Sequence, residues 1–125
     1  MANIGQSLLL LDDNEWRQQR ARQIWPACTV VATVPECIRL LELRDWSTVS
    51  LDHDLGGEEY VKSDRVDCGM EVVRWAIVHN PRVNEWLVHS HNNIAAMLMV
   101  NALRGAGFTV HRKRFGEGDL WTPKR

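Results

Sequence analysis

The 125-residue sequence has little of several features that mark particular protein classes. It has three cysteines and no C-x-x-C pair, so we expect reduced thiols rather than a disulfide framework. Its 15 Lys and Arg balance 16 Asp and Glu, and the net charge of -1 excludes nucleic-acid binding through bulk charge alone. It has no apolar run near the roughly 18 residues of a membrane span, and no secretory signal pattern. We therefore expect a cytoplasmic protein that does not span a membrane.

Tyrosine and phenylalanine are also scarce, with one and two residues, whereas tryptophan occurs six times. Large aromatic side chains mostly fill protein cores. Four of the tryptophans lie in expected helices or strands, where packing is the simplest role: Trp25, Trp46, Trp75 and Trp86. Trp16, just after a pair of aspartates, and Trp121, near the C-terminus, are the candidates for stacking on a nucleobase.

The composition, with 45% hydrophobic and 25% charged residues, is that of one globular domain. Short apolar runs alternate with helical patterns, which is typical of βα units on a parallel sheet. The expected strands are 7–11, 28–33, 48–51, 86–88 and a last strand beginning at 108–110. The expected helices are 14–25, 35–46, 69–79 and 94–103.

This order predicts one α/β domain over residues 1–125, with its core at about 7–115 and a short tail at 116–125. Right-handed crossovers favour a flavodoxin-like, doubly wound sheet of five parallel strands in the order 2-1-3-4-5. Little chain remains for a helix after the last strand, so that helix is expected to be short or missing. The flank it would cover is a candidate homodimer contact.

Polar side chains follow four of the expected strands. They are Asp12-Asp13, Asp52-His53-Asp54, His89-Ser90-His91-Asn92 and Arg112-Lys113-Arg114. In an open parallel sheet, ligands bind outside the carboxyl ends of the strands, near the switch in strand order. We therefore expect these four groups to meet in one crevice.

The aspartates of this crevice predict a divalent-metal site. Crowded carboxylates cannot all stay ionised unless a cation is present. Asp12, Asp13 and Asp52 are the candidate ligands, and their hard oxygen atoms favour Mg²⁺ or Mn²⁺. Nearby imidazoles would also permit Zn²⁺. The simpler alternative for Asp13 or Asn14 is to cap the helix that follows.

Other polar residues are expected to act on a phosphate group. His53 and His89 are candidates for acid–base catalysis, although hydrogen bonding around the site would also explain them. Ser90 and Lys113 are the candidates for stabilising charge on phosphate oxygens.

Supporting roles are predicted for four more residues. Asp54 is expected to orient a histidine or a metal-bound water. Arg17, His91 and Asn92 are expected to contact the substrate or the catalytic groups, with a helix cap as the alternative for Asn92. The polar segment 58–67 is a candidate lid over the crevice.

The whole pattern resembles the receiver domain of response regulators. Asp12-Asp13 is similar to the acidic metal-binding pair of that fold, and Asp52 stands where its phosphoacceptor aspartate would be. Ser90 and Lys113 are similar to its hydroxyl residue after the fourth strand and its lysine after the fifth.

A closer resemblance is to the receiver-like family known as cyclic-phosphate-processing receiver domains. Three blocks carry it: Leu11-Asp12-Asp13, Ser-Leu-Asp-His-Asp-Leu-Gly at 50–56, and Val-His-Ser-x-Asn at 88–92. The resemblance implies a divergent receiver fold whose pocket handles a phosphate ester. Two departures stand out: no proline follows the acidic pair near Arg17, and His91 replaces a common glutamine.

Two functions remain open. The first is a metal-dependent phosphoesterase that opens a cyclic phosphate in a cyclic nucleotide or at the 2′,3′-cyclic-phosphate end of an RNA. The alternative is a non-catalytic module that signals like a receiver or sequesters a nucleotide. The histidines disfavour a plain receiver, because phosphoryl transfer to aspartate needs none of them. The predicted site requires Asp12, Asp52 and His89 to lie within about 10 Å of one another.

Overall fold

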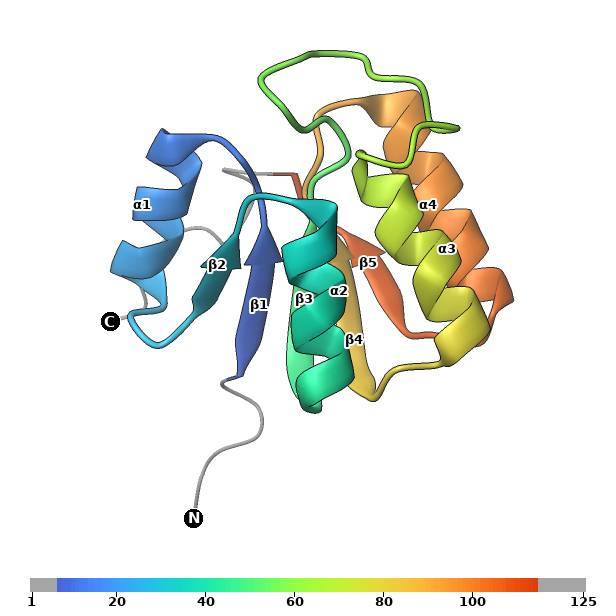
Figure 1. Cartoon of the computed structure of the whole chain (residues 1–125), viewed down its shortest axis with the longest axis horizontal. Helices are drawn as coiled ribbons and strands as arrows, with labels where there is room; N and C mark the ends of the chain where they lie inside the picture. Colours follow the sequence, from blue (N-terminus) through green and yellow to red (C-terminus); the bar gives the residue numbers. More distant parts are fainter. Residues whose placement is uncertain (1–6, 115–125) are drawn as a thin grey trace.

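A computed structural model describes residues 7–114, which form a five-stranded parallel sheet with associated helices (Figure 1). The strands are β1 (Leu8–Leu11), β2 (Thr29–Val31), β3 (Trp46–Leu51), β4 (Val83–Val88) and β5 (Val110–Arg112). The helices are α1 (Glu15–Ile24), α2 (Val34–Leu43), α3 (Gly69–His79) and α4 (Asn93–Gly105). The strand order is β2-β1-β3-β4-β5, and every neighbouring pair is parallel. The predicted α/β fold and strand order are confirmed.

Side-chain caps begin three of these helices. The side chain of Asn14 accepts a hydrogen bond from a backbone N–H of α1, and Thr33 does the same for α2. Asn92 caps α4 in the same way. At the other end of α3, Asn80 takes a left-handed conformation with φ of 50°, which ends the helix.

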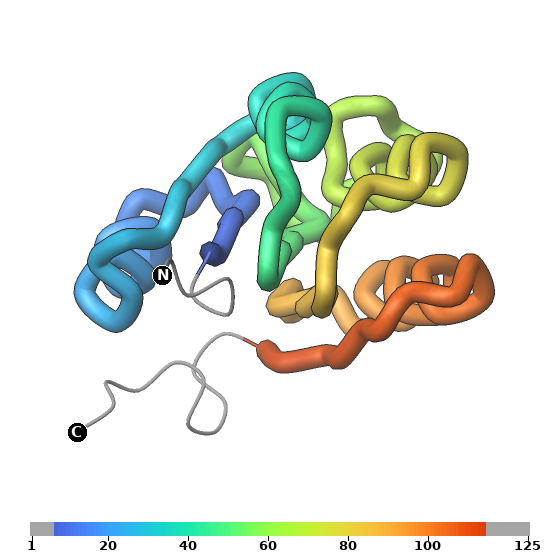
Figure 2. The backbone as a smooth tube through the Cα atoms, turned by 90° about the horizontal axis from the view of Figure 1, so that it is seen from below, coloured from blue at the N-terminus to red at the C-terminus, as the bar shows by residue number. Residues whose placement is uncertain are grey.

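Two hydrophobic clusters cover the sheet. The larger joins β1, β3 and β4 to α2, α3 and α4, which Figure 2 shows in succession around one side of the molecule. The smaller lies under α1 and centres on Leu10 and Ala21. Leu8–Leu11 is buried throughout, because a central parallel strand has a covered face on each side. The core therefore holds the strands rigidly and fixes where each strand ends.

Several predicted boundaries were wrong, among them the start of the strand expected over 48–51, which begins at Trp46. The helix expected over 35–46 ends at Leu43, because Trp46 begins β3 and its indole N–H donates to the carbonyl oxygen of Leu40 at 3.0 Å. The strand β4 begins at Val83, which pairs with Trp46, and so is longer than predicted. The strand β5 begins at Val110, within the predicted start of 108–110.

The tryptophans divide as predicted where the structure describes them. Trp46 and Trp86 are buried, Trp25 and Trp75 pack against the two clusters, and Trp16 is 65% exposed. Trp121, the tail 116–125 and the flank predicted to lack a fifth helix lie outside the described residues. Of the helices within 7–114, none is long and apolar enough to cross a membrane.

Candidate functional site

A pocket of about 410 Å³ opens at the carboxyl ends of the central strands. It is lined by residues that follow β1, β3 and β4 and by the segment 57–60. The predicted crevice residues among them are Asp13, Arg17, Asp52, Asp54, His89, Ser90, His91 and Asn92. The first three of the four predicted polar groups therefore meet in one pocket.

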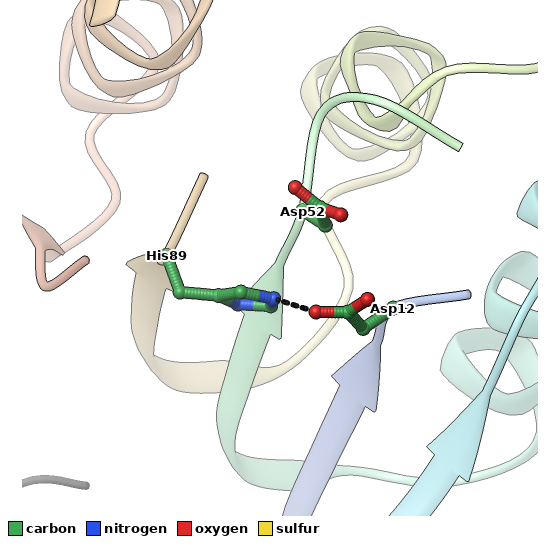
Figure 3. A group of neighbouring side chains, drawn as sticks. All are labelled: Asp12, Asp52 and His89. Carbon is green, nitrogen blue, oxygen red and sulfur yellow. Dashed lines mark hydrogen bonds and ion pairs between the residues drawn. The ribbon is translucent and has the colours of Figure 1, made fainter. Parts of the chain in front are cut away.

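Asp12, Asp52 and His89 form a buried cluster (Figure 3), and Asp52 and His89 also line this pocket. One ligand atom from each lies within 4.8 Å of the others, and all three residues are buried. They come together because each directly follows its strand and the last residues of β1, β3 and β4 are in register. This geometry is well inside the limit that the predicted site required.

The carboxylate of Asp12 accepts four hydrogen bonds. Its Oδ2 atom accepts from Arg17 Nε at 2.7 Å and from His89 Nε2 at 2.9 Å. Its Oδ1 atom accepts from the backbone N–H of Asn14 at 2.8 Å and from Arg17 Nη2 at 3.2 Å. Burial raises the pKa of Asp12, but His89 and Arg17 more than offset this, so that the pKa lies below its usual value. Asp12 is therefore held as a carboxylate.

Asp52 has a different electrostatic environment. Burial raises its pKa to about 6, and the neighbouring charge of Asp12 acts in the same direction. Its donors are fewer: the backbone N–H of His53 at 2.9 Å and, more distantly, Arg17 Nη2 at 3.5 Å. Two buried carboxylates with this balance of charge are suited to a divalent cation, which would stabilise both as anions.

The imidazole of His89 is oriented by Ser50, a residue the sequence analysis did not single out. Ser50 Oγ lies 2.7 Å from His89 Nδ1. A hydroxyl can donate or accept a hydrogen bond. It can donate to Nδ1 when Nε2 carries the proton and donates to Asp12, and it can accept from Nδ1 when Nε2 is free to bind a metal. The available signal was a hydroxyl inside an apolar strand, two residues before Asp52 and so on the same side of the strand.

Asp13 lines the pocket but lies outside the Asp12–Asp52–His89 cluster. Its Oδ2 atom accepts from the backbone N–H of Gly57 at 2.7 Å. The predicted third metal ligand is thus placed to tie the loop after β3 to the end of β1.

Asp54 binds the same loop more extensively. Its two oxygen atoms accept from the backbone N–H groups of Tyr60 at 2.8 Å and Val61 at 3.1 Å. Its Oδ1 atom also accepts from Asn92 Nδ2 at 3.3 Å and from His53 Nδ1 at 2.7 Å. The histidine that Asp54 contacts, His53, lies outside the Asp12–Asp52–His89 cluster.

His53 is completely buried and does not line the pocket. Its Nε2 atom lies 3.0 Å from Ser63 Oγ, across the loop from Asp54. Burial lowers the pKa of His53, but its contacts with Cys68 and Asp54 more than offset this effect. The pKa of His53 therefore lies above its usual value. This position favours a role in holding the loop, in place of the predicted acid–base role.

The predicted lid segment does border the pocket, through Glu58, Glu59 and Tyr60. Its start turns on Gly56 and Gly57, with φ of 78° and 76°, and Tyr60 has φ of 53°. A left-handed tyrosine is strained, and the hydrogen bond to Asp54 holds it there. Its side chain is 77% exposed at the pocket mouth.

The segment after β4 contributes three predicted residues. Ser90 is buried and its Oγ atom accepts from the backbone N–H of Asn92 at 3.0 Å. His91 is exposed at the rim of the pocket. Asn92 caps α4, which was the alternative considered for it, and its side-chain amide also donates to Asp54.

The fourth predicted group is placed differently. Lys113 is exposed and is not among the residues that line the pocket. Arg112 approaches the site instead: its Nη2 atom donates to the carbonyl oxygen of Ser90 at 2.8 Å and to Asn93 Oδ1 at 2.7 Å. Arg112 was not predicted as a site residue, because sequence alone does not show which of three consecutive basic residues turns toward β4.

Solved structures similar to this one are receiver domains. The signal receiver domain of a Luxo-type repressor protein from Vibrio parahaemolyticus matches with a TM-score of 0.57 and 16% identity, covering 86% of this chain and 77% of that one. A Burkholderia pseudomallei response regulator with a phosphorylated aspartic acid and a calcium ion matches with a TM-score of 0.55 and 15% identity, covering 85% and 58%. For the Salmonella typhimurium RcsB response regulator, the TM-score is 0.53 and the identity 15%, with 91% and 54% covered. At these identities the likeness shows the fold.

None of the curated proteins compared with the chain matches it. A family model does match, over residues 7–105, and its description is "cyclic-phosphate processing receiver domain". The matched region runs from the start of β1 to the end of α4 and includes the whole Asp12–Asp52–His89 cluster. The chain belongs to the family of cyclic-phosphate processing receiver domains.

Proposed function

We propose that this domain is a metal-dependent phosphoesterase that opens a cyclic phosphate, in a cyclic nucleotide or at the 2′,3′-cyclic-phosphate end of an RNA. The observation that carries the proposal is the buried imidazole of His89 beside the carboxylates of Asp12 and Asp52, under an open pocket. Phosphoryl transfer to an aspartate requires no imidazole there. The family description points to the same class of substrate.

The donor set suits a transition-metal ion. Asp12 and Asp52 offer carboxylate oxygens and His89 offers an imidazole nitrogen, and together they would hold the ion. Mn²⁺ and Zn²⁺ accept such a mixed set, whereas Mg²⁺ prefers oxygen ligands alone. A bound ion polarises a phosphoryl oxygen and lowers the pKa of its water.

The chain's own residues bind the phosphate and supply protons. The guanidinium of Arg17 pairs with two phosphate oxygens, and the hydroxyl of Ser90 donates to a third. As the water oxygen bonds to phosphorus, the water gives one proton to solvent, and the ring P–O bond breaks. The leaving alkoxide takes a proton from His91, which lies at the rim of the pocket and regains a proton from solvent. The products are a phosphomonoester and a free hydroxyl.

Asp13, His53 and Asp54 act on the loop over the pocket. Their contacts with Gly57, Tyr60 and Ser63 fix that loop before substrate arrives. Lys113 contributes no group to this scheme.

A substrate panel tests the proposal. The protein is incubated with 2′,3′- and 3′,5′-cyclic mononucleotides, cyclic di- and oligonucleotides and RNA ending in a 2′,3′-cyclic phosphate, with Mn²⁺, Mg²⁺, Zn²⁺ or EDTA. We expect phosphomonoester product with at least one substrate, lost with EDTA and in Asp52→Asn, and kept in Asp45→Asn at the opposite end of the sheet.

The same panel distinguishes the alternative. Absence of any chelator-sensitive product contradicts a phosphoesterase. Tight binding of one nucleotide without conversion then indicates a sequestering module. Radiolabel taken up from acetyl phosphate, and lost in Asp52→Asn, indicates a receiver that accepts phosphate.

A further inference from the structure

Arg17 is the cation that neutralises the two buried aspartates. It lies in the first turn of α1, and its guanidinium reaches Asp12 at 2.7 and 3.2 Å and Asp52 at 3.5 Å. The side chain of Arg17 is 27% exposed, whereas those of Asp12 and Asp52 are 0% and 7% exposed. One positive charge is thus shared by two carboxylates that also form the candidate metal site.

The carboxylate of Asp12 has no room for a further partner. A carboxylate has about four lone-pair positions, and the four donors to Asp12 occupy both of its oxygens. A metal ion can therefore bind Asp12 only if one of these donors leaves. This is a requirement of valence and geometry, whichever ion binds.

Arg17 is the donor whose departure the metal site still requires after His89 has become a ligand. The backbone N–H of Asn14 is fixed, because Asn14 is the N-cap of α1 and the chain turns there. Ser50 holds the other nitrogen of His89, so the imidazole would bind the ion through Nε2 and would then give up its hydrogen bond to Asp12. Arg17 would still contact both oxygens of Asp12 and one of Asp52, and its positive charge would oppose the ion. Arg17 has a long, flexible side chain that already lines the pocket.

The released guanidinium would have one clear ligand. Arg17 is the only lysine or arginine among the described residues that line the pocket, and most charged groups there are carboxylates. A phosphate ester entering this pocket needs positive charge to offset those carboxylates. A guanidinium binds phosphate oxygens in a two-pronged arrangement.

We propose that Arg17 is a built-in competitor of the metal, and that metal binding moves its guanidinium from Asp12 and Asp52 to the phosphate of the substrate. Arg17 is a positioning residue in this scheme before substrate binds, and a phosphate ligand afterwards. The inference rests on the metal site of the proposed function. It makes metal and phosphate binding mutually favourable, since each removes an obstacle to the other.

Metal titration of the full chain without substrate tests the first half. Binding of Mn²⁺ is measured by calorimetry for wild type, Arg17→Gln and, as a control on the same helix, the exposed Arg22→Gln. We expect the Mn²⁺ dissociation constant to fall about tenfold in Arg17→Gln and to stay within about twofold in Arg22→Gln. Unchanged or weaker Mn²⁺ binding in folded Arg17→Gln overturns the proposal, as does absence of Mn²⁺ binding in both proteins.

Phosphate binding tests the second half. Inorganic phosphate is titrated into wild type and Arg17→Gln, each saturated with Mn²⁺ or treated with EDTA. We expect wild type to need Mn²⁺ for phosphate binding, and Arg17→Gln with Mn²⁺ to bind phosphate at least tenfold more weakly than wild type with Mn²⁺. Equal phosphate affinity in the two Mn²⁺-loaded proteins overturns the transfer of Arg17 to phosphate.

These binding experiments fail separately from the proposed function. If Mn²⁺ affinity rises in Arg17→Gln but no cyclic phosphate is hydrolysed, the role of Arg17 stands and the phosphoesterase does not. If hydrolysis is seen and Mn²⁺ affinity does not rise, the phosphoesterase stands and the role of Arg17 does not.

Discussion

The two ends of β3 carry buried side chains of opposite character. Trp46 is the first residue of the strand and is 3% exposed, and Asp52 directly follows the strand and is 5% exposed. The indole N–H of Trp46 has a carbonyl acceptor, and the guanidinium of Arg44 covers its ring at 4.2 Å. The carboxylate of Asp52 instead faces a second buried carboxylate, that of Asp12. Equal burial stabilises the fold at one end of the strand and costs stability at the other.

The same contrast extends across the sheet. The structure describes seven buried polar or charged residues, and all but Ser47 lie at or near the carboxyl ends of the strands. The hydrophobic clusters bury the strand interiors and the amino end of β3, where Trp46 packs. Stability at one edge thus supports a costly arrangement of polar groups at the other, which we propose binds a cation and a phosphate.

The largest expected effect is at the amino end. Trp46→Ala should lower the free energy of unfolding by about 3–5 kcal/mol, because it removes a large buried ring and its hydrogen bond. Urea unfolding with EDTA measures this. A loss below about 1 kcal/mol would mean that this end of β3 contributes little to the core.

A somewhat smaller loss is expected for Asp12→Asn. The amide cannot accept all four hydrogen bonds, and it leaves Arg17 and His89 without their anionic partner, at a cost of about 2–4 kcal/mol. Because the folded pKa of Asp12 lies below its usual value, its carboxylate stabilises the fold above about pH 4, and this contribution disappears as the pH falls further. Urea unfolding at pH 8 and at a series of pH values below 4 should show a difference between wild type and variant that is largest at pH 8 and shrinks as the pH falls below 4.

Asp52→Asn should change stability in the opposite direction. The pKa of Asp52 is raised to about 6 in the folded state, so its ionisation destabilises the metal-free fold as the pH rises from about 4 to above 6. The variant should therefore be about 1–2 kcal/mol more stable than wild type at pH 8 with EDTA, and equal to it near pH 4. A destabilised Asp52→Asn at pH 8 would contradict the claim that this end of the sheet carries a stability cost.

The smallest effect is expected at the pocket mouth. Tyr60→Gly relieves a left-handed φ, which should raise the free energy of unfolding by up to about 1 kcal/mol and leave the buried cluster unchanged. Thermal unfolding of Tyr60→Gly and Tyr60→Phe makes the comparison, since the phenylalanine keeps the strain. Equal midpoints for the two variants would show that the loop is not strained at this position.

Much of this arrangement could be predicted from the sequence because it depends on backbone pattern. Apolar runs indicate where parallel strands end, so the residues that follow β1, β3 and β4 could be placed at one edge, and Asp12, Asp52 and His89 are found together there. What sequence does not determine is the partner of each side chain. Asp13 was predicted as a metal ligand and His53 as an acid–base catalyst, and both side chains contact the loop after β3.

The physical reason lies in that loop. Its path depends on three left-handed residues, Gly56, Gly57 and Tyr60, and no periodic pattern predicts a left-handed tyrosine. Gly69, at the start of α3, packs so closely that a Cβ atom would lie 1.9 Å from the carbonyl oxygen of Asp52. These contacts bring the loop over the strand ends and decide which polar side chains remain in the pocket.

We propose that Asp12, Asp52 and His89 hold a metal ion in competition with Arg17. Anomalous diffraction from crystals grown with Mn²⁺ tests it most directly. We predict a single strong peak about 2.0–2.3 Å from a carboxylate oxygen of each aspartate and from a nitrogen of His89, with the Arg17 guanidinium withdrawn from Asp12. Crystals in saturating Mn²⁺ that show no peak there, with Arg17 still bound to both aspartates, would contradict the account.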